Sequence, residues 1–207
     1  MKEILIALAL AVVLSVAGFY TWKVLGSRAP AVPQVVVDTR SSYATSTYSV
    51  KYPSDFILNA PYAYDQFGPK KLINGVKFII PGTMAMASTS SPQAGTNLSG
   101  DTYLSVEQLP RAKRCTGDIY LQANVTARDI TENGTEYSFA SSTGVAAGNL
   151  YEEQVYALAT SSPCTAVRYF IHSANIGNYE PGTAREYDRA ALLSSFDKIR
   201  QSVLISL

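Results

Sequence analysis

Hydrophobic and polar residues alternate in several short stretches of the chain. Tyr48, Val50 and Tyr52 are each separated by one other residue, which predicts a strand with one buried face over residues 47–52. Pro53 follows at once and ends this strand in a turn. The same alternation, bounded by turn-forming residues, predicts two further strands over residues 75–80 and 103–109.

The second half of the chain shows paired segments of the same kind. Asn133-Gly134 stands between two alternating arms, and this dipeptide favours a tight turn, so residues 130–139 are predicted to form a β-hairpin. Residues 150–158 and 165–173 are predicted to be two more strands that pair with each other. Short strands joined by short connections are typical of an antiparallel sheet.

The spacing of apolar residues changes near the C-terminus. Leu192, Phe196, Ile199 and Val203 recur at the spacing of one helix face, which predicts an amphipathic helix packed on the sheet. Charged residues around it are expected to form its polar faces: Arg185, Asp188, Arg189, Asp197, Lys198 and Arg200. A shorter helix is expected over residues 118–121. The predicted fold class is therefore α+β, an antiparallel β-sheet packed with a C-terminal helix.

The N-terminus carries a continuous apolar run over residues 4–22. At about 1.5 Å per helical residue this run is roughly 28 Å long, close to the hydrocarbon thickness of a bilayer. Phe19, Tyr20 and Trp22 cluster at its end, where aromatic rings favour the headgroup layer. We therefore predict an N-terminal transmembrane anchor over residues 1–26, through which the chain contacts the membrane.

A cleaved signal peptide is the alternative interpretation of this run. Ser15-Val-Ala17 before Gly18 has the small-x-small form of a cleavage site, although the apolar run continues beyond it. Either interpretation exports the rest of the chain. We expect a single-pass protein of the cell membrane, with a Pro-containing linker over residues 27–42 and an extracytoplasmic globular domain over residues 43–207.

Composition narrows the possible partners. The net charge is only +1, so we expect no nucleic-acid partner, and no motif indicates a cofactor. Residues 82–100 are long, rich in Ser and Thr and without periodicity, which is typical of a disordered or a functional loop.

The two cysteines, Cys115 and Cys164, bear on both location and chemistry. Two cysteines in an exported domain favour a disulfide, with two buried free thiols as the alternative. Together with one histidine they supply too few ligands for a predicted metal site.

No catalytic set emerges from the sequence. His172 is the only histidine, and it lies in a predicted strand without a nucleophile motif beside it. Glu152 and Glu153 are adjacent in a predicted strand, so they point to opposite faces and make a poor acid–base pair. We therefore expect a protein that is not an enzyme, with no catalytic residue assigned.

The order of elements resembles the PsbP family, extrinsic proteins of photosystem II and their bacterial relatives. The resemblance rests on the opening Tyr48-Ser-Val-Lys-Tyr-Pro-Ser-Asp-Phe56, the later strands and the closing Phe196-Asp-Lys-Ile-Arg-Gln-Ser-Val203. It implies a PsbP-like α/β sandwich in a bacterial membrane-anchored relative, a small extracytoplasmic or accessory domain that binds partners. It carries over no functional residue, because the family shares no catalytic set.

One face of the strand pair 150–158 and 165–173 is a candidate binding surface. If Leu158 pairs with Cys164, six residues of mixed chemistry share a face: Glu152, Gln154, Tyr156, Arg168, Phe170 and His172. Aromatic and charged side chains of this kind are enriched at recognition sites. The alternative is an ordinary solvated face with an Arg168–Glu152 ion pair. A slip of one residue in register would split the set.

These observations favour a membrane-tethered extracytoplasmic binding or assembly module, whose partner is an envelope protein or ligand that the sequence does not identify. Two other functions stay open: a structural subunit of an envelope complex, and an envelope hydrolase whose carboxylates or histidine converge from distant segments.

Overall fold

The computed structural model describes residues 40–65, 72–80, 94–122 and 124–206. The predicted anchor over residues 1–26 lies outside the described residues, as does most of the predicted linker over residues 27–42. Within the described ranges no helix is both long enough and apolar enough to cross a bilayer.

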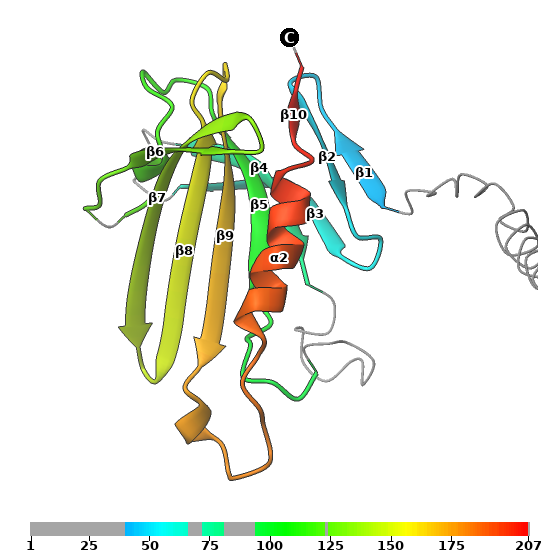
Figure 1. Cartoon of the computed structure of the whole chain (residues 1–207), viewed down its shortest axis with the longest axis vertical. Helices are drawn as coiled ribbons and strands as arrows, with labels where there is room; N and C mark the ends of the chain where they lie inside the picture. Colours follow the sequence, from blue (N-terminus) through cyan, green and yellow to red (C-terminus); the bar gives the residue numbers. More distant parts are fainter. Residues whose placement is uncertain (1–39, 66–71, 81–93, 123, 207) are drawn as a thin grey trace, which may run out of the picture. The chain divides into compact units, whose positions relative to one another are not determined.

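A seven-stranded antiparallel sheet forms the centre of the domain (Figure 1). Its strands, in spatial order, are β3 (Ile57–Asp65), β4 (Leu72–Ile79), β5 (Tyr103–Leu109), β9 (Cys164–Ala174), β8 (Asn149–Leu158), β7 (Thr135–Ala146) and β6 (Arg128–Glu132). The sequence patterns predict five of these seven strands outright. They miss β3, and they stop β7 short at Phe139, whereas the strand continues to Ala146.

A second, smaller sheet and the C-terminal helix pack beside the large sheet. The small sheet consists of β1 (Ser41–Ala44), β2 (Tyr48–Tyr52) and β10 (Leu204–Ile205). Strand β1 begins inside the range predicted as linker, so Ser41 and Ser42 belong to the folded domain. The predicted strand over residues 47–52 is confirmed as β2, and Tyr48, Val50 and Tyr52 are buried.

The helix α2 (Arg189–Arg200) covers one face of the large sheet, which we call the helix face (Figure 1). Asp188 caps its N-terminus by accepting a hydrogen bond from the backbone N–H of Ala191 at 2.9 Å. Leu192, Phe196 and Ile199 are buried as their spacing predicts, and the Phe196 ring lies 5.1 Å from that of Tyr169. The α+β class, with a C-terminal helix on an antiparallel sheet, is confirmed.

Arg200 corrects one expectation for this helix, because it is buried instead of solvated. Its Nε donates to the Tyr169 hydroxyl at 2.8 Å, and its guanidinium pairs with Glu132 and Asp197. The guanidinium carbon also lies 4.0 Å from the centroid of the Tyr156 ring. Helical spacing alone does not show that a charged side chain near a helix end can be held over aromatic rings in this way.

The opposite face, the outer face, is covered at one end by residues 110–122 and 124–127. This segment contains the 3-10 helix η1 (Gly117–Tyr120), which confirms the short helix expected over residues 118–121. Gly117 lies so close to β7 that an added Cβ would stand 2.7 Å from the Ala140 nitrogen. Tyr120 and Leu121 are buried against Val155 and other apolar residues of the sheet. Both faces of the sheet are therefore packed at this end.

Two-residue turns join β6 to β7 and β7 to β8. The Asn133-Gly134 turn is confirmed, with φ of 51° and 79°. Ala147 and Gly148 adopt the same left-handed conformation, with φ of 48° and 78°. Ala147 is an unusual residue for this conformation, so the sequence gives little sign of the second turn.

Part of the irregular segment over residues 82–100 is well ordered. Residues 82–93 lie outside the described residues. Thr96 forms a parallel bridge with Arg185, and Leu98 an antiparallel bridge with Ser173. Asn97 between them is buried and donates through its side chain to the Ala174 carbonyl at 2.7 Å. For residues 94–100, an interpretation as a disordered loop is therefore wrong.

Candidate functional site

The register of β8 with β9 differs by one residue from the pairing that the binding-surface hypothesis assumes. Leu158 pairs with Thr165 instead of Cys164, and Glu153 stands opposite Phe170. Because side chains alternate between faces, this slip splits the six candidate residues into two groups. Glu152, Gln154 and Tyr156 lie on the helix face, and Arg168, Phe170 and His172 on the outer face.

The helix-face group forms a chain of hydrogen bonds that ends at the first turn of α2. The Tyr156 hydroxyl donates to Gln154 Oε1 at 3.1 Å, and Gln154 Nε2 donates to Glu152 Oε1 at 2.5 Å. Arg189 Nε donates to Glu152 Oε2 at 3.0 Å. Burial acts to raise the pKa of the Glu152 carboxyl, but the hydrogen bonds from Arg189 and Gln154 outweigh it and lower that pKa. This group holds the helix on the sheet.

Arg168 is the centre of a buried ion-pair network on the outer face. Its Nε donates to Glu107 Oε1 at 3.0 Å, one Nη donates to the Tyr120 carbonyl at 2.5 Å, and the other pairs with Glu153. Ser105 donates its hydroxyl to Glu107 Oε1 at 2.7 Å. The side chain of Arg168 is 1% exposed and that of Glu107 is fully buried. Arg168 therefore holds the domain together and is not open to a partner.

Beyond this network, the outer face carries a row of half-buried rings, which we call the aromatic strip: Tyr103, Phe170, Tyr151 and His172. Tyr103 and Phe170 are register partners on β5 and β9, and their rings stack with centroids 5.1 Å apart. Tyr151 and His172 are register partners on β8 and β9, and their rings stack at 4.3 Å. The two pairs meet where the Tyr151 and Phe170 rings lie 6.3 Å apart.

Charged groups flank the aromatic strip at both ends. The Lys77 ammonium lies 4.0 Å from the centroid of the Tyr103 ring, a cation–π geometry. Burial lowers the pKa of Lys77. At the other end, His172 Nδ1 lies 2.6 Å from Asp101 Oδ1. Sequence reasoning finds Phe170 and His172. It places Tyr151 on the opposite face, because it assumes the wrong register of β8 with β9. It misses Tyr103, Lys77 and Asp101, because they join the strip only through the strand order β4-β5-β9.

Among the described residues, the Asp101–His172 pair has no third member of a nucleophilic triad. His172 Nε2 is buried and has no hydrogen-bond partner in the described part of the chain. A base that activates a hydroxyl needs that hydroxyl within hydrogen-bond reach. Within the described ranges, no group of three His, Cys, Asp or Glu residues is placed to hold a metal ion.

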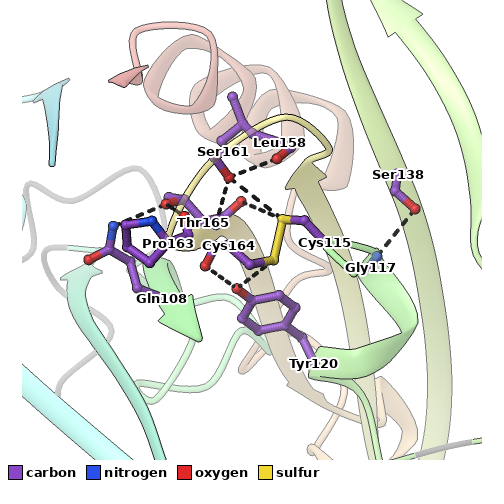
Figure 2. The surroundings of a disulfide bond; sticks show 10 residues. All are labelled: Gln108, Cys115, Gly117, Tyr120, Ser138, Leu158, Ser161, Pro163, Cys164 and Thr165. Atoms are coloured by element: carbon purple, nitrogen blue, oxygen red, sulfur yellow. Dashed lines mark hydrogen bonds between the residues drawn. A yellow bond between two sulfur atoms is a disulfide. The ribbon is translucent and has the colours of Figure 1, made fainter. Parts of the chain in front are cut away.

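A disulfide joins Cys115 to Cys164, as the sequence predicts (Figure 2). It links the segment that covers the outer face to the first residue of β9, with the two Cα atoms 5.0 Å apart. The Tyr120 hydroxyl donates to the Cys164 carbonyl at 2.8 Å, so η1 is tied to the same point (Figure 2). The bridge therefore fixes the segment that shields the Arg168 network.

The helix face contains a pocket of about 630 Å³ near the ends of β7 and β8. One wall is the end of the β7–β8 hairpin, and another is the chain that leads into α2. Its lining combines aliphatic side chains with a few polar ones, among them Val145, Leu150, Ile176, Asn97, Tyr187 and Arg189. Glu152 does not line this pocket but pairs with Arg189, which does. This volume is in the range of small-molecule sites, which run from roughly 300 to 1,000 Å³.

Comparison with known proteins identifies no family. No family model matches the chain, and no curated protein matches it. A crystal structure of a protein from Bacteroides thetaiotaomicron VPI-5482 is similar over 80% of this chain, with a TM-score of 0.38 and 9% identity. The match spans 48% of that protein's chain.

Proposed function

We propose that the protein is a protein-binding module, tethered to the membrane by residues 1–26 with its domain outside the cytoplasm, and that the aromatic strip is its binding surface. The observation that carries this proposal is the row of four half-buried rings on the outer face, flanked by Lys77 and Asp101. Aromatic side chains that combine apolar area with polar edges are enriched in the energetically important parts of protein interfaces.

The stacking of the rings favours a protein over a sugar or a nucleic acid. Tyr103 and Phe170 cover each other's faces, as do Tyr151 and His172, and Lys77 lies over the Tyr103 ring. A nucleic-acid base stacks on a free ring face. The strip combines ring edges with charged groups of both signs, which suits the mixed contacts of a protein interface.

The disulfide and the predicted anchor support an extracytoplasmic location. Disulfides such as Cys115–Cys164 persist mainly in oxidising compartments. A PsbP-like accessory domain is in keeping with the antiparallel sheet and the C-terminal helix, and it remains part of the proposal. The chain should stay in the membrane fraction after a carbonate wash. A mature N-terminus at Gly18, found by mass spectrometry, would show a cleaved signal instead.

Binding of a small ligand is the second candidate function, and the pocket beside Val145 and Arg189 supports it. A hydrolase is less favoured. Glu107 and Glu153 do converge, but both pair with Arg168, and Glu107 is sealed from solvent. A carboxylate that is buried and neutralised in this way is poorly placed to act on a substrate.

Site-specific photo-crosslinking in cells tests the main proposal. A photoreactive phenylalanine analogue at Tyr151 should give a discrete heavier adduct that contains a second protein. The same analogue at Tyr179, which is exposed outside the strip, is the matched control and should give none. The proposal is overturned if the variant with the analogue at position 151 has the wild-type melting temperature but forms no protein adduct in cells. A small-molecule adduct formed by the same analogue at Leu150, which lines the pocket on the opposite face, would favour the second candidate.

A further inference from the structure

Strand β7 is paired on both sides over only part of its length. Strand β6 pairs with residues 135–139, and its last pairing joins Arg128 to Phe139. From Ala140 to Ala146, β7 pairs with β8 alone. In Figure 1 this stretch of β7, toward its arrowhead, lies at the margin of the sheet beyond the end of β6. We call residues 141–146 the free edge.

The backbone of the free edge is oriented to accept another strand. The two-residue turn closes on the pair Ala146–Asn149, so the residues that bond to β8 are Ala146 and every second residue before it. Ser141, Thr143 and Val145 therefore direct their N–H and C=O groups away from β8. No described residue outside β8 hydrogen-bonds to these groups.

The other edges of the large sheet carry features that prevent strand addition, and the free edge does not. Edge strand β3 is interrupted by a register shift between Asn59 and Tyr62. Edge strand β6 is short and carries Arg128, Asp129 and Glu132. Such breaks and charges are the usual protection of a sheet edge. The free edge has regular register, no proline and no charge, and its Val145 is 81% exposed.

We propose that a second copy of this chain occupies the free edge, so that two β7 strands pair antiparallel about a two-fold axis at Thr143. Thr143 would then face Thr143 of the partner subunit, and Ser141 would face Val145 of the partner subunit. All three outward backbone positions of each copy would donate and accept a hydrogen bond. Such a contact is isologous, because the same segment serves both copies.

The length of the free edge supports a second copy over an unrelated strand. In this register Ala147 of the partner subunit would stand opposite Phe139. Ala147 is the first residue of the turn between β7 and β8, and Phe139 pairs with Arg128, the first residue of β6. Each copy's strand therefore ends where the other copy's edge becomes occupied. No like charges are opposed, and the partner's strand covers Val145, the most exposed of the large apolar side chains described.

Cysteine crosslinking in membranes that hold the full chain tests the axis. The native cysteines are already joined, so a thiol introduced by Thr143→Cys has no intramolecular partner among them. Mild oxidation should link Thr143→Cys chains into a dimer. Thr131→Cys, on the protected edge strand β6, is the matched control and should not link. Co-expressed Ser141→Cys and Val145→Cys chains should link to each other and not to themselves.

Sedimentation of the purified full chain in detergent tests the same contact without a crosslink. Thr143→Lys places two ammonium groups face to face and should weaken self-association by about tenfold or more, whereas Thr131→Lys should not. Equal melting temperatures would show that both variants fold. A wild-type chain that stays monomeric at all concentrations, or equal linking of Thr143→Cys and Thr131→Cys, would overturn the proposal. A Thr143→Cys adduct with a different protein would show that a foreign strand occupies the edge.

Discussion

Replacement of Arg168 by methionine should destabilise the domain strongly. Methionine preserves most of the length of the side chain but removes the guanidinium that pairs with Glu107 and Glu153. Because Glu107 is fully buried, water cannot compensate. Removing one partner of a buried ion pair typically costs about 3–5 kcal/mol, and we expect Arg168→Met to fall in this range. For a domain of this size, such a loss lowers the melting temperature by roughly 10 °C.

Urea unfolding monitored by circular dichroism measures this loss of stability. Two further variants test its cause. Arg168→Met combined with Glu107→Gln and Glu153→Gln removes the charges together, and it should be more stable than Arg168→Met alone. Arg189→Met breaks the ion pair with Glu152 near the surface, where Arg189 is 51% exposed, and should cost only about 0–1 kcal/mol.

Two results would refute this reasoning. A loss below about 1 kcal/mol for Arg168→Met would mean that the network contributes no more than a surface pair. A triple variant less stable than Arg168→Met would mean that the unpaired carboxylates are not the cause. Either result would also reopen Arg168 as a residue available for binding.

Three further predictions concern stability. Replacing both Cys115 and Cys164 by serine should lower the free energy of unfolding in urea by up to about 4 kcal/mol, the chain-entropy value for a loop of this length. Alkylation of two native thiols in untreated protein would contradict the bridge. Phe196→Ala should cost about 3–5 kcal/mol in the same assay, and a loss below about 1 kcal/mol would mean that α2 is not packed as described. The hydrogen bonds from Arg189 help to lower the pKa of Glu152. The wild-type chain should therefore be more stable than Glu152→Gln near neutral pH, and this difference in unfolding free energy should shrink below about pH 4. A difference that does not change with pH would contradict this cause.

The sequence predicts the parts of the fold whose signals are local. Alternation identifies β2 and β5, Asn133-Gly134 identifies one hairpin turn, and helical spacing identifies the buried face of α2. The strands it misses lack such signals. Strand β3 is interrupted by a register shift, and β10 spans only two residues. Strands without a clean alternating pattern become visible only when their neighbours are known.

The candidate site depends on contacts between distant segments, which local patterns do not contain. Glu107 and Arg168 are separated by 61 residues, and nothing near either residue marks it as half of a buried pair. The same holds for Arg200, which pairs with Glu132 across 68 residues. A charged residue in an alternating strand or on a helix is expected in solvent unless its partner is known. Sequence reasoning therefore places both arginines on polar faces.

The register error at β8 and β9 has a more specific physical cause. Register is normally set because one face of a strand is apolar and the other is not. Near the disulfide both faces of this pair are buried: Val167 packs beneath α2, and Ala166 packs beneath η1. An apolar pattern that satisfies both faces does not distinguish two registers that differ by one residue. The choice depends on the network around Arg168 and on the segment held by Cys115, and the aromatic strip exists only in the register that they select.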